Sequence, residues 1–110
     1  MTGKEYVKQI KKIDTQIKNK TFELEQFRNC GLPAGNVLDS ITDLCLKKSE
    51  IIKTIEKLPE AEYDVLHRAY VQYETLYEIA DARGITYRHA AGIHGRALKR
   101  LDDILNCVEA

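Results

Sequence analysis

The sequence predicts an all-α protein in which an antiparallel helical hairpin is followed by a module of three shorter helices. Apolar residues recur every three or four positions along most of the chain, and no segment shows the alternating pattern of a strand. Clusters of glycine and proline divide these helical segments, and with only 2 prolines in 110 residues long helices are permitted. We place the boundary between hairpin and module after residue 58, giving segments 1–58 and 59–110.

The first helix is expected to run from about Lys4 to Arg28. Thr2 and Glu5 have the spacing of a capping box at its start. Its apolar positions alternate steps of four and three, which is typical of the narrow seam of a coiled coil. These seam residues are Tyr6, Ile10, Ile13, Ile17, Leu24 and Phe27.

Residues 29–36 contain two glycines and a proline and predict a loop. Asn36 is the expected N-cap of a second helix that runs to about Leu58. Because the loop is short, the two helices should lie antiparallel. Lys20 and Lys48 occupy seam positions, where polar residues fix pairing or register. The second seam consists of Val37, Ile41, Leu44, Ile51, Ile55 and Leu58.

The second helix carries an additional apolar stripe beside its seam. Leu38, Cys45 and Ile52 repeat every seven residues, so this face is wider than the first helix can cover. The stripe must be buried against the C-terminal module or against another copy of the protein. We favour a homodimer with these three residues at its interface, because an isolated hairpin has a weak core.

Two short helices are expected next. Pro59 suits the first position of a helix, and the third helix is predicted over residues 60–71. Thr75 and Glu78 form a second capping-box pattern, which starts a fourth helix over residues 75–83. The third helix is expected to bury Tyr63, Leu66, Ala69 and Tyr70.

The fourth and fifth helices have the pattern of a helix-turn-helix. Ala80 provides the small residue that two steeply crossing helices need, and Gly84 suits the left-handed turn that follows. Thr86 is the expected cap of the fifth helix, which continues to about Asn106. The residues expected on the inward faces are Ile79, Ile85, Ala90 and Ile93.

The formal net charge is zero, but the charges are sorted along the chain. Residues 60–83 hold six acidic and two basic side chains, whereas residues 84–101 hold no acidic side chain and two of the three histidines. The basic residues of this second segment are Arg88, Arg96, Lys99 and Arg100. A phosphate backbone would therefore bind at residues 84–101.

The sequence does not support a disulfide framework, a metal site, an active site or a membrane span. Cys30, Cys45 and Cys107 are odd in number and form no C-x-x-C pair, which argues against a disulfide framework and a metal site. We find no nucleophile–base pair and no glycine-rich phosphate loop, so we expect no catalysis, cofactor or small-molecule substrate. No apolar run has the length of a signal peptide or membrane span, and we expect a cytoplasmic protein without a membrane partner.

Four segments together resemble region four of bacterial sigma factors. They are Leu58–Leu66, Leu76–Ala80, Gly84–Arg88 and Ile93–Leu101. With the charged first helix, the whole chain resembles the small sigma-like late transcription regulators of Gram-positive bacteriophages (ArpU/RinA type). The resemblance implies a fold with a region-four-like module, and duplex DNA and RNA polymerase as partners.

In that family the start of the last helix enters the major groove. The resemblance implies that Thr86 directs the helix N-terminus at a phosphate, that Arg88 contacts a base, and that Arg96 contacts a phosphate. Ala91 and Gly92 replace long polar side chains, which indicates either close approach of the helix backbone to DNA or another helix, or a weakened recognition helix. The implied DNA-binding residues are Thr86, Tyr87, Arg88, His89, Gly92, Arg96, Lys99 and Arg100.

The expected function is sequence-specific DNA binding that regulates transcription, as a phage late-gene activator acting with host RNA polymerase. Two alternatives stay open at this point. A phage small terminase subunit also joins a helix-turn-helix to helical oligomerisation elements, but it recognises packaging sites. An adaptor that binds RNA polymerase or a regulator would use the same module without binding DNA.

Overall fold

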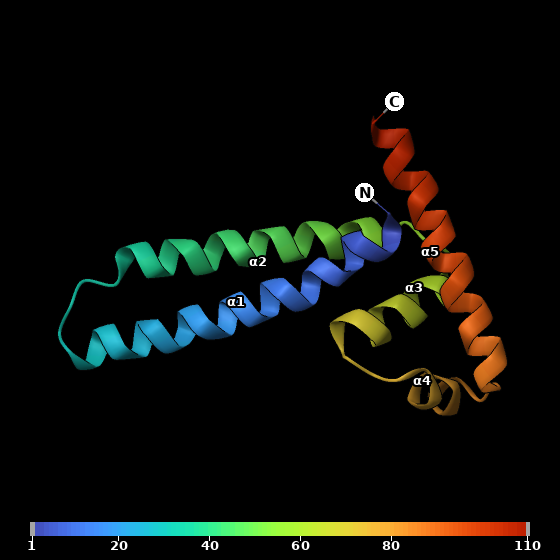
Figure 1. Cartoon of the computed structure of the whole chain (residues 1–110), viewed down its shortest axis with the longest axis horizontal. Coiled ribbons are helices and arrows are strands. Elements are labelled where there is room, and N and C mark those ends of the chain that lie inside the picture. The colour runs from blue at the N-terminus through green and yellow to red at the C-terminus, as the bar shows by residue number, and fades with distance from the viewer. Residues whose placement is uncertain (1, 110) are drawn as a thin grey trace.

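The computed structural model describes residues 2–109, with side chains to residue 107, and over this range it is helical with no strand. The all-α prediction is confirmed. Figure 1 shows α1 and α2 side by side as a long arm, with the shorter helices and α5 gathered at one end. The elements are α1 (Gly3–Asn29), α2 (Gly35–Ile55), α3 (Glu60–Leu66), the π-helical turn η1 (His67–Val71), α4 (Leu76–Arg83) and α5 (Tyr87–Glu109).

The arm is the expected antiparallel hairpin. At the start of α1, the Thr2 hydroxyl accepts the backbone N–H of Glu5 at 3.1 Å, which is one of the two hydrogen bonds of the predicted capping box. The predicted Asn36 cap of α2 is wrong. The helix begins at Gly35, because the carbonyl of Ala34 already accepts the N–H of Leu38 at 3.0 Å. Asn36 therefore lies inside the first turn, where its side chain cannot cap the helix.

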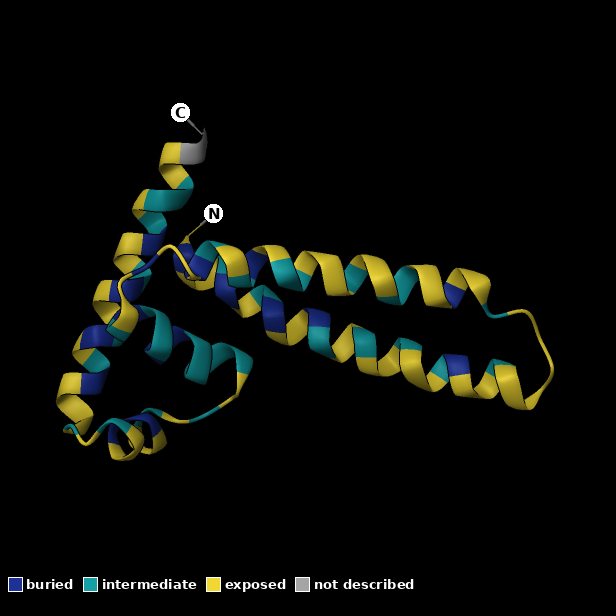
Figure 2. Ribbon diagram, turned by 180° about the vertical axis from the view of Figure 1, so that it is seen from behind, coloured by how far each residue is buried: buried dark blue, intermediate teal, exposed yellow. Residues whose placement is uncertain are grey.

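The two seams of the hairpin face each other, and Figure 2 shows dark blue mainly along the inner side of the arm. The most buried seam residues of the arm are Ile10, Ile13, Leu24, Val37, Ile51 and Ile55. Lys48 crosses the hairpin, with its Nζ 2.7 Å from Asp14 Oδ1. Lys20 instead pairs with Glu23 on its own helix at 3.2 Å. Lys48 is therefore the seam lysine that fixes the pairing of α1 with α2.

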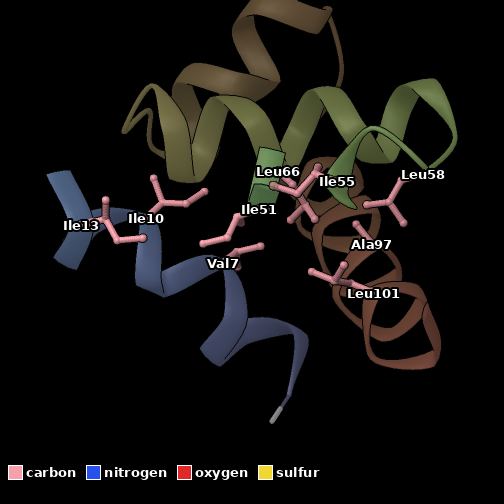
Figure 3. Packing of buried hydrophobic residues seen from close by; sticks show 9 residues of the cluster. All are labelled: Val7, Ile10, Ile13, Ile51, Ile55, Leu58, Leu66, Ala97 and Leu101. Atoms are coloured by element: carbon pink, nitrogen blue, oxygen red, sulfur yellow. The ribbon is translucent and has the colours of Figure 1, made fainter. Parts of the chain in front are cut away.

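The main hydrophobic core lies where the base of the arm meets α3 and α5 (Figure 3). Burying each large apolar side chain stabilises the fold by about 1.5–3 kcal/mol, so this contact holds the arm to the C-terminal helices. The buried members are Val7, Ile10, Ile13, Ile51, Ile55, Leu58, Leu66, Ala97 and Leu101.

The N-terminus of α1 packs directly on α5. A Cβ at Gly3 would lie 2.7 Å from the carbonyl oxygen of Leu98, closer than carbon and oxygen can approach. The N–H of Gly3 also donates to the carboxylate of Asp102. A residue without a side chain is thus required where the two helices touch.

A second, smaller cluster holds the C-terminal helices together. Val65, Ile79 and Ile93 are buried in it, and Ile85 packs against them from the turn. Ala90 is fully buried as well. The inward faces predicted for the helix-turn-helix are confirmed.

Besides the start of α2, three helix boundaries differ from prediction. The second helix ends at Ile55 rather than Leu58, although Leu58 is buried. The third predicted helix is α-helical only to Leu66 and continues as η1, where the Gln72 N–H bonds to the His67 carbonyl at 3.1 Å. Tyr73 then stops the helix with a positive φ of 58°. The fifth helix runs past Asn106 to Glu109.

Candidate nucleic-acid interface

The capping box at the start of α4 forms as predicted. The Thr75 hydroxyl accepts the backbone N–H of Glu78, and the Glu78 carboxylate accepts the backbone N–H of Thr75, both at 3.2 Å. Two N–H groups that would otherwise have no partner are thereby satisfied. These two hydrogen bonds fix the residue at which α4, the first helix of the motif, begins.

The turn between α4 and α5 is built on Gly84, which has a φ of +67°. The Gly84 N–H bonds to the Asp81 carbonyl at 3.2 Å, and the Ile85 N–H bonds to the Ala80 carbonyl at 3.0 Å. These are the two hydrogen bonds of a Schellman motif, which needs a left-handed residue at this place. The structure confirms the predicted glycine turn.

The side chain of Thr86 caps the N-terminus of α5. The Thr86 hydroxyl accepts the His89 N–H at 3.1 Å, as expected. No acidic residue lies in the first turn of α5. The leading N–H groups of a helix carry a partial positive charge, so this end of α5 favours an anion.

The eight predicted DNA-binding residues are all exposed on α5 or directly before it. Arg88, Gly92, Arg96 and Lys99 follow one another at steps of four, four and three, which places them on one face of the helix. The opposite face carries the buried residues Ala90, Ile93, Ala97 and Leu101. The fold therefore presents the predicted residues together while α5 stays anchored in the core.

The basic residues predicted on α5 are not equivalent. Arg100 Nε lies 2.7 Å from the Glu62 carboxylate, and the Glu62 side chain is only 8% exposed. Much of the charge of Arg100 is therefore balanced within the fold. Arg96 and Lys99 line a shallow surface hollow with Arg100 and Asp103. We expect Arg96 and Lys99 to be more available to a phosphate than Arg100.

The two glycines of α5 are not required by packing within the chain. A Cβ at Gly92 would meet an Arg96 nitrogen at 4.0 Å, an ordinary contact, and a Cβ at Gly95 would meet nothing within 4 Å. Another helix of the same chain therefore does not approach Gly92. Close approach of DNA or of a second molecule, and a weakened recognition helix, remain the two explanations of this residue.

The acidic residues of the module are largely engaged in holding α3, η1 and α4 together. Arg83 lies 2.7 Å from Asp64 and 3.4 Å from Glu60, and Arg68 lies 3.1 Å from Asp64 and 3.3 Å from Glu74. Burial raises the pKa of Asp64, but hydrogen bonds from Arg83 and Arg68 outweigh it and hold the pKa below its ordinary value. This network holds α4 and η1 against α3.

His94 is a half-buried residue of α5 that the sequence did not single out as a site. Its Nε2 lies 2.9 Å from the Tyr70 hydroxyl, and the two rings stack at 5.7 Å. Burial lowers the pKa of His94, and the positive charge of Lys4 acts in the same direction. His94 therefore supports the contact of α5 with η1 and is not part of the exposed face.

An aromatic pair beside the turn was missed by sequence analysis. The rings of Tyr77 on α4 and Tyr87 on α5 stack with centroids 4.3 Å apart and an interplanar angle of 28°. Tyr77 is 70% exposed. An aromatic residue on the polar side of α4, away from Ile79 and Ala80, was the available signal.

The comparison with known families agrees with this geometry. Residues 54–103 match the family model described as Sigma-70, region 4. The match covers the end of α2, the helix-turn-helix and most of α5, so the module is a helix-turn-helix domain of the region 4 type. Region 4 is a DNA-binding domain of transcription and not an enzyme family, which indicates a DNA-binding, transcription-regulating role for this module. No curated protein and no solved structure matches the chain.

Within residues 2–107, no group of three or more histidine, cysteine, aspartate or glutamate side chains could hold a metal ion. None of the described helices is long and apolar enough to span a membrane.

Proposed function

We propose that the chain is a phage-encoded late-gene activator that binds promoter DNA through α5 and acts with the host RNA polymerase. The region 4 match supports the DNA-binding part of this proposal. The phage assignment rests on the resemblance of the whole chain, including its charged first helix, to small sigma-like phage regulators.

The observation that carries the proposal is the exposed face of α5 within residues 84–101, where the helix has basic and no acidic side chains. Thr86 would direct the helix N-terminus at a phosphate, while Tyr87, Arg88 and His89 lie at the base edges of the major groove. An arginine there can pair with the two acceptor atoms of a guanine. Arg96 and Lys99 would bind phosphates further along, which sets affinity and register rather than sequence preference.

We also propose that the arm joins two copies of the chain. In the single chain Cys45 is exposed and Leu38 is 44% exposed, while Ile52 is half-buried, so the C-terminal module does not cover this stripe. Packing two arms together would bury it and widen a core that is thin in the outer part of the hairpin. In this proposal the hairpin, residues 1–58, is the oligomerisation domain, and residues 59–110 bind DNA.

The base-contacting role is tested with Arg88→Ala on a duplex selected by the wild-type chain from a random library. The variant should lose about 1–3 kcal/mol of binding free energy on that duplex and discriminate less between sequences. Arg28→Ala is the matched control, because Arg28 is an exposed arginine at the far end of the arm. Equal affinities of Arg88→Ala and the wild type for the selected duplex would overturn the base-contacting role.

The assembly is tested by light scattering of the full chain. A dimer that Leu38→Lys converts to a monomer supports the proposed interface. A large ring would instead favour a small terminase subunit, and a monomeric wild type would overturn the dimer. Absence of DNA binding even at low salt would favour an adaptor that contacts proteins alone.

A further inference from the structure

The stacked pair of Tyr77 and Tyr87 is not explained by the packing of the fold. Tyr77 is 70% exposed and Tyr87 is 44% exposed, and neither belongs to the hydrophobic clusters that hold the helices together. Little apolar area is therefore removed from water by keeping these rings in place. Their mutual stacking nevertheless gives both rings a defined orientation on the surface.

The hydroxyl groups of the pair are also unused. Within the described part of the chain, no hydrogen bond involves the hydroxyl of Tyr77 or Tyr87, whereas Tyr6, Tyr70 and Tyr73 bond to Thr54, His94 and Asp14. A tyrosine hydroxyl can donate to a phosphate oxygen, while its ring packs on the sugar.

The pair lies where the exposed face of α5 begins. Tyr87 is the first residue of α5 and precedes Arg88, and Tyr77 is the second residue of α4. The stack thus spans the turn and joins both helices of the motif on one surface. The neighbouring Glu78 carboxylate accepts a backbone hydrogen bond in the capping box, which partly offsets the negative charge beside Tyr77.

We propose that Tyr77 is a further DNA-contacting residue, whose hydroxyl donates to a backbone phosphate while its ring holds Tyr87 against the groove. This inference rests on the proposed binding of DNA by α5. With Tyr77 included, the contact surface extends from the start of α5 across the turn to α4.

The test compares Tyr77→Phe and Tyr77→Ala with the wild-type chain, using fluorescence anisotropy on a labelled duplex selected by the wild type. Both variants should bind roughly three- to tenfold more weakly, in line with the loss of one hydrogen bond or one aromatic pair. The loss of Tyr77→Phe should be the same on selected and unrelated duplexes, because a phosphate contact is independent of sequence. Tyr77→Ala should lose more on the selected duplex, because it also removes the ring on which Tyr87 stacks. The salt dependence should stay unchanged, because no charge is removed.

A second set of variants tests the coupling of the two rings. Tyr87→Ala should weaken binding mainly on the selected duplex, and adding Tyr77→Ala should cost less than the product of the two single losses. Phe22→Ala is the matched control, since Phe22 is an aromatic residue on the arm that is 63% exposed. It should bind as the wild type does.

The outcomes separate this inference from the function on which it rests. Equal affinities of Tyr77→Phe and the wild type would overturn the phosphate contact and leave DNA binding by α5 intact. No binding of the wild type at low salt would overturn the proposed function itself. Circular dichroism establishes that each variant is folded, and Tyr77→Phe keeps the ring stack in case Tyr77→Ala does not fold.

Discussion

Gly3 and Gly95 show how differently one residue type acts at two places in this fold. Gly3 lies where α1 touches α5, with room for a hydrogen but not for a methyl group. Gly95 lies on the open face of α5, where a Cβ would meet no other side chain or helix within 4 Å. The sequence contains no signal that separates them, because the difference comes from a contact between residues almost a whole chain apart.

Substituting alanine at these positions should change stability in opposite directions. Alanine favours a helix over glycine by about 1 kcal/mol, so Gly95→Ala should raise the free energy of unfolding by about that amount. Gly3→Ala at the first position of α1 places a methyl group against the Leu98 carbonyl, and the clash should leave the protein less stable than the wild type. Urea denaturation measures both. A stabilised Gly3→Ala variant would contradict the close packing of α1 on α5.

The half-buried His94 should make the protein sensitive to acid. Its pKa in the folded state is lowered from the ordinary value of 6.5 by burial and then by Lys4. The unfolded chain therefore takes up a proton at a higher pH than the folded chain does. The stability that the neutral His94 contributes is fully present above pH 6.5. It is lost as the pH falls through the pKa of His94 in the folded state.

Denaturant unfolding between about pH 7.5 and about pH 5 measures this effect. The free energy of unfolding should fall less steeply toward acid in His94→Gln than in the wild type, because glutamine cannot take up a proton but can still bond to Tyr70. Parallel curves for the two proteins would show that His94 does not carry the acid sensitivity.

At the scale of elements, the helix-turn-helix could be predicted because its signals are local. Thr75, Glu78, Gly84 and Thr86 each act on backbone groups within a few residues, and each is found in its expected role. The π-helical turn at His67 was not predictable in this way. Its length and register depend on packing against α1, α4 and α5, which a sequence pattern does not contain.

The role of the left-handed turn at Gly84 can be tested with Gly31 as a matched control, because both glycines have a positive φ. Gly84→Ala and Gly31→Ala both place a Cβ on a residue with φ near +68°, and neither Cβ would meet a neighbouring atom. Each should therefore cost about 1–2 kcal/mol of stability through backbone strain. Gly84→Ala should also weaken DNA binding, because the turn sets the position of α5, whereas Gly31→Ala in the hairpin loop should not. Equal DNA affinities of the two variants would contradict that role of the turn.

At the scale of the whole molecule, the arm and the C-terminal helices are joined into one structure. The main core draws on α1, α2, α3 and α5, and Asp14 of the arm bonds to both Lys48 and the Tyr73 hydroxyl. The sequence predicted the antiparallel hairpin but not this attachment. Asp14 stands near the middle of a charged helix, and its two partners come from distant parts of the chain.

The sequence predicted the basic segment of the candidate site but not the contacts that Arg100 and Tyr77 make with other helices. The acid-free segment 84–101 could be recognised because its charges are consecutive in sequence. The pairing of Arg100 with Glu62 and the stacking of Tyr77 on Tyr87 could not, because each joins different helices. These contacts shift the proposed DNA surface away from Arg100 and toward the turn.

The salt dependence of binding to duplex DNA tests the central claim most directly. If α5 binds DNA, the affinity of the full chain should fall steeply as salt rises, and Arg96→Ala should reduce the logarithmic slope by about 1 while Arg28→Ala leaves it unchanged. An affinity that does not depend on salt, or no binding at low salt, would contradict the account.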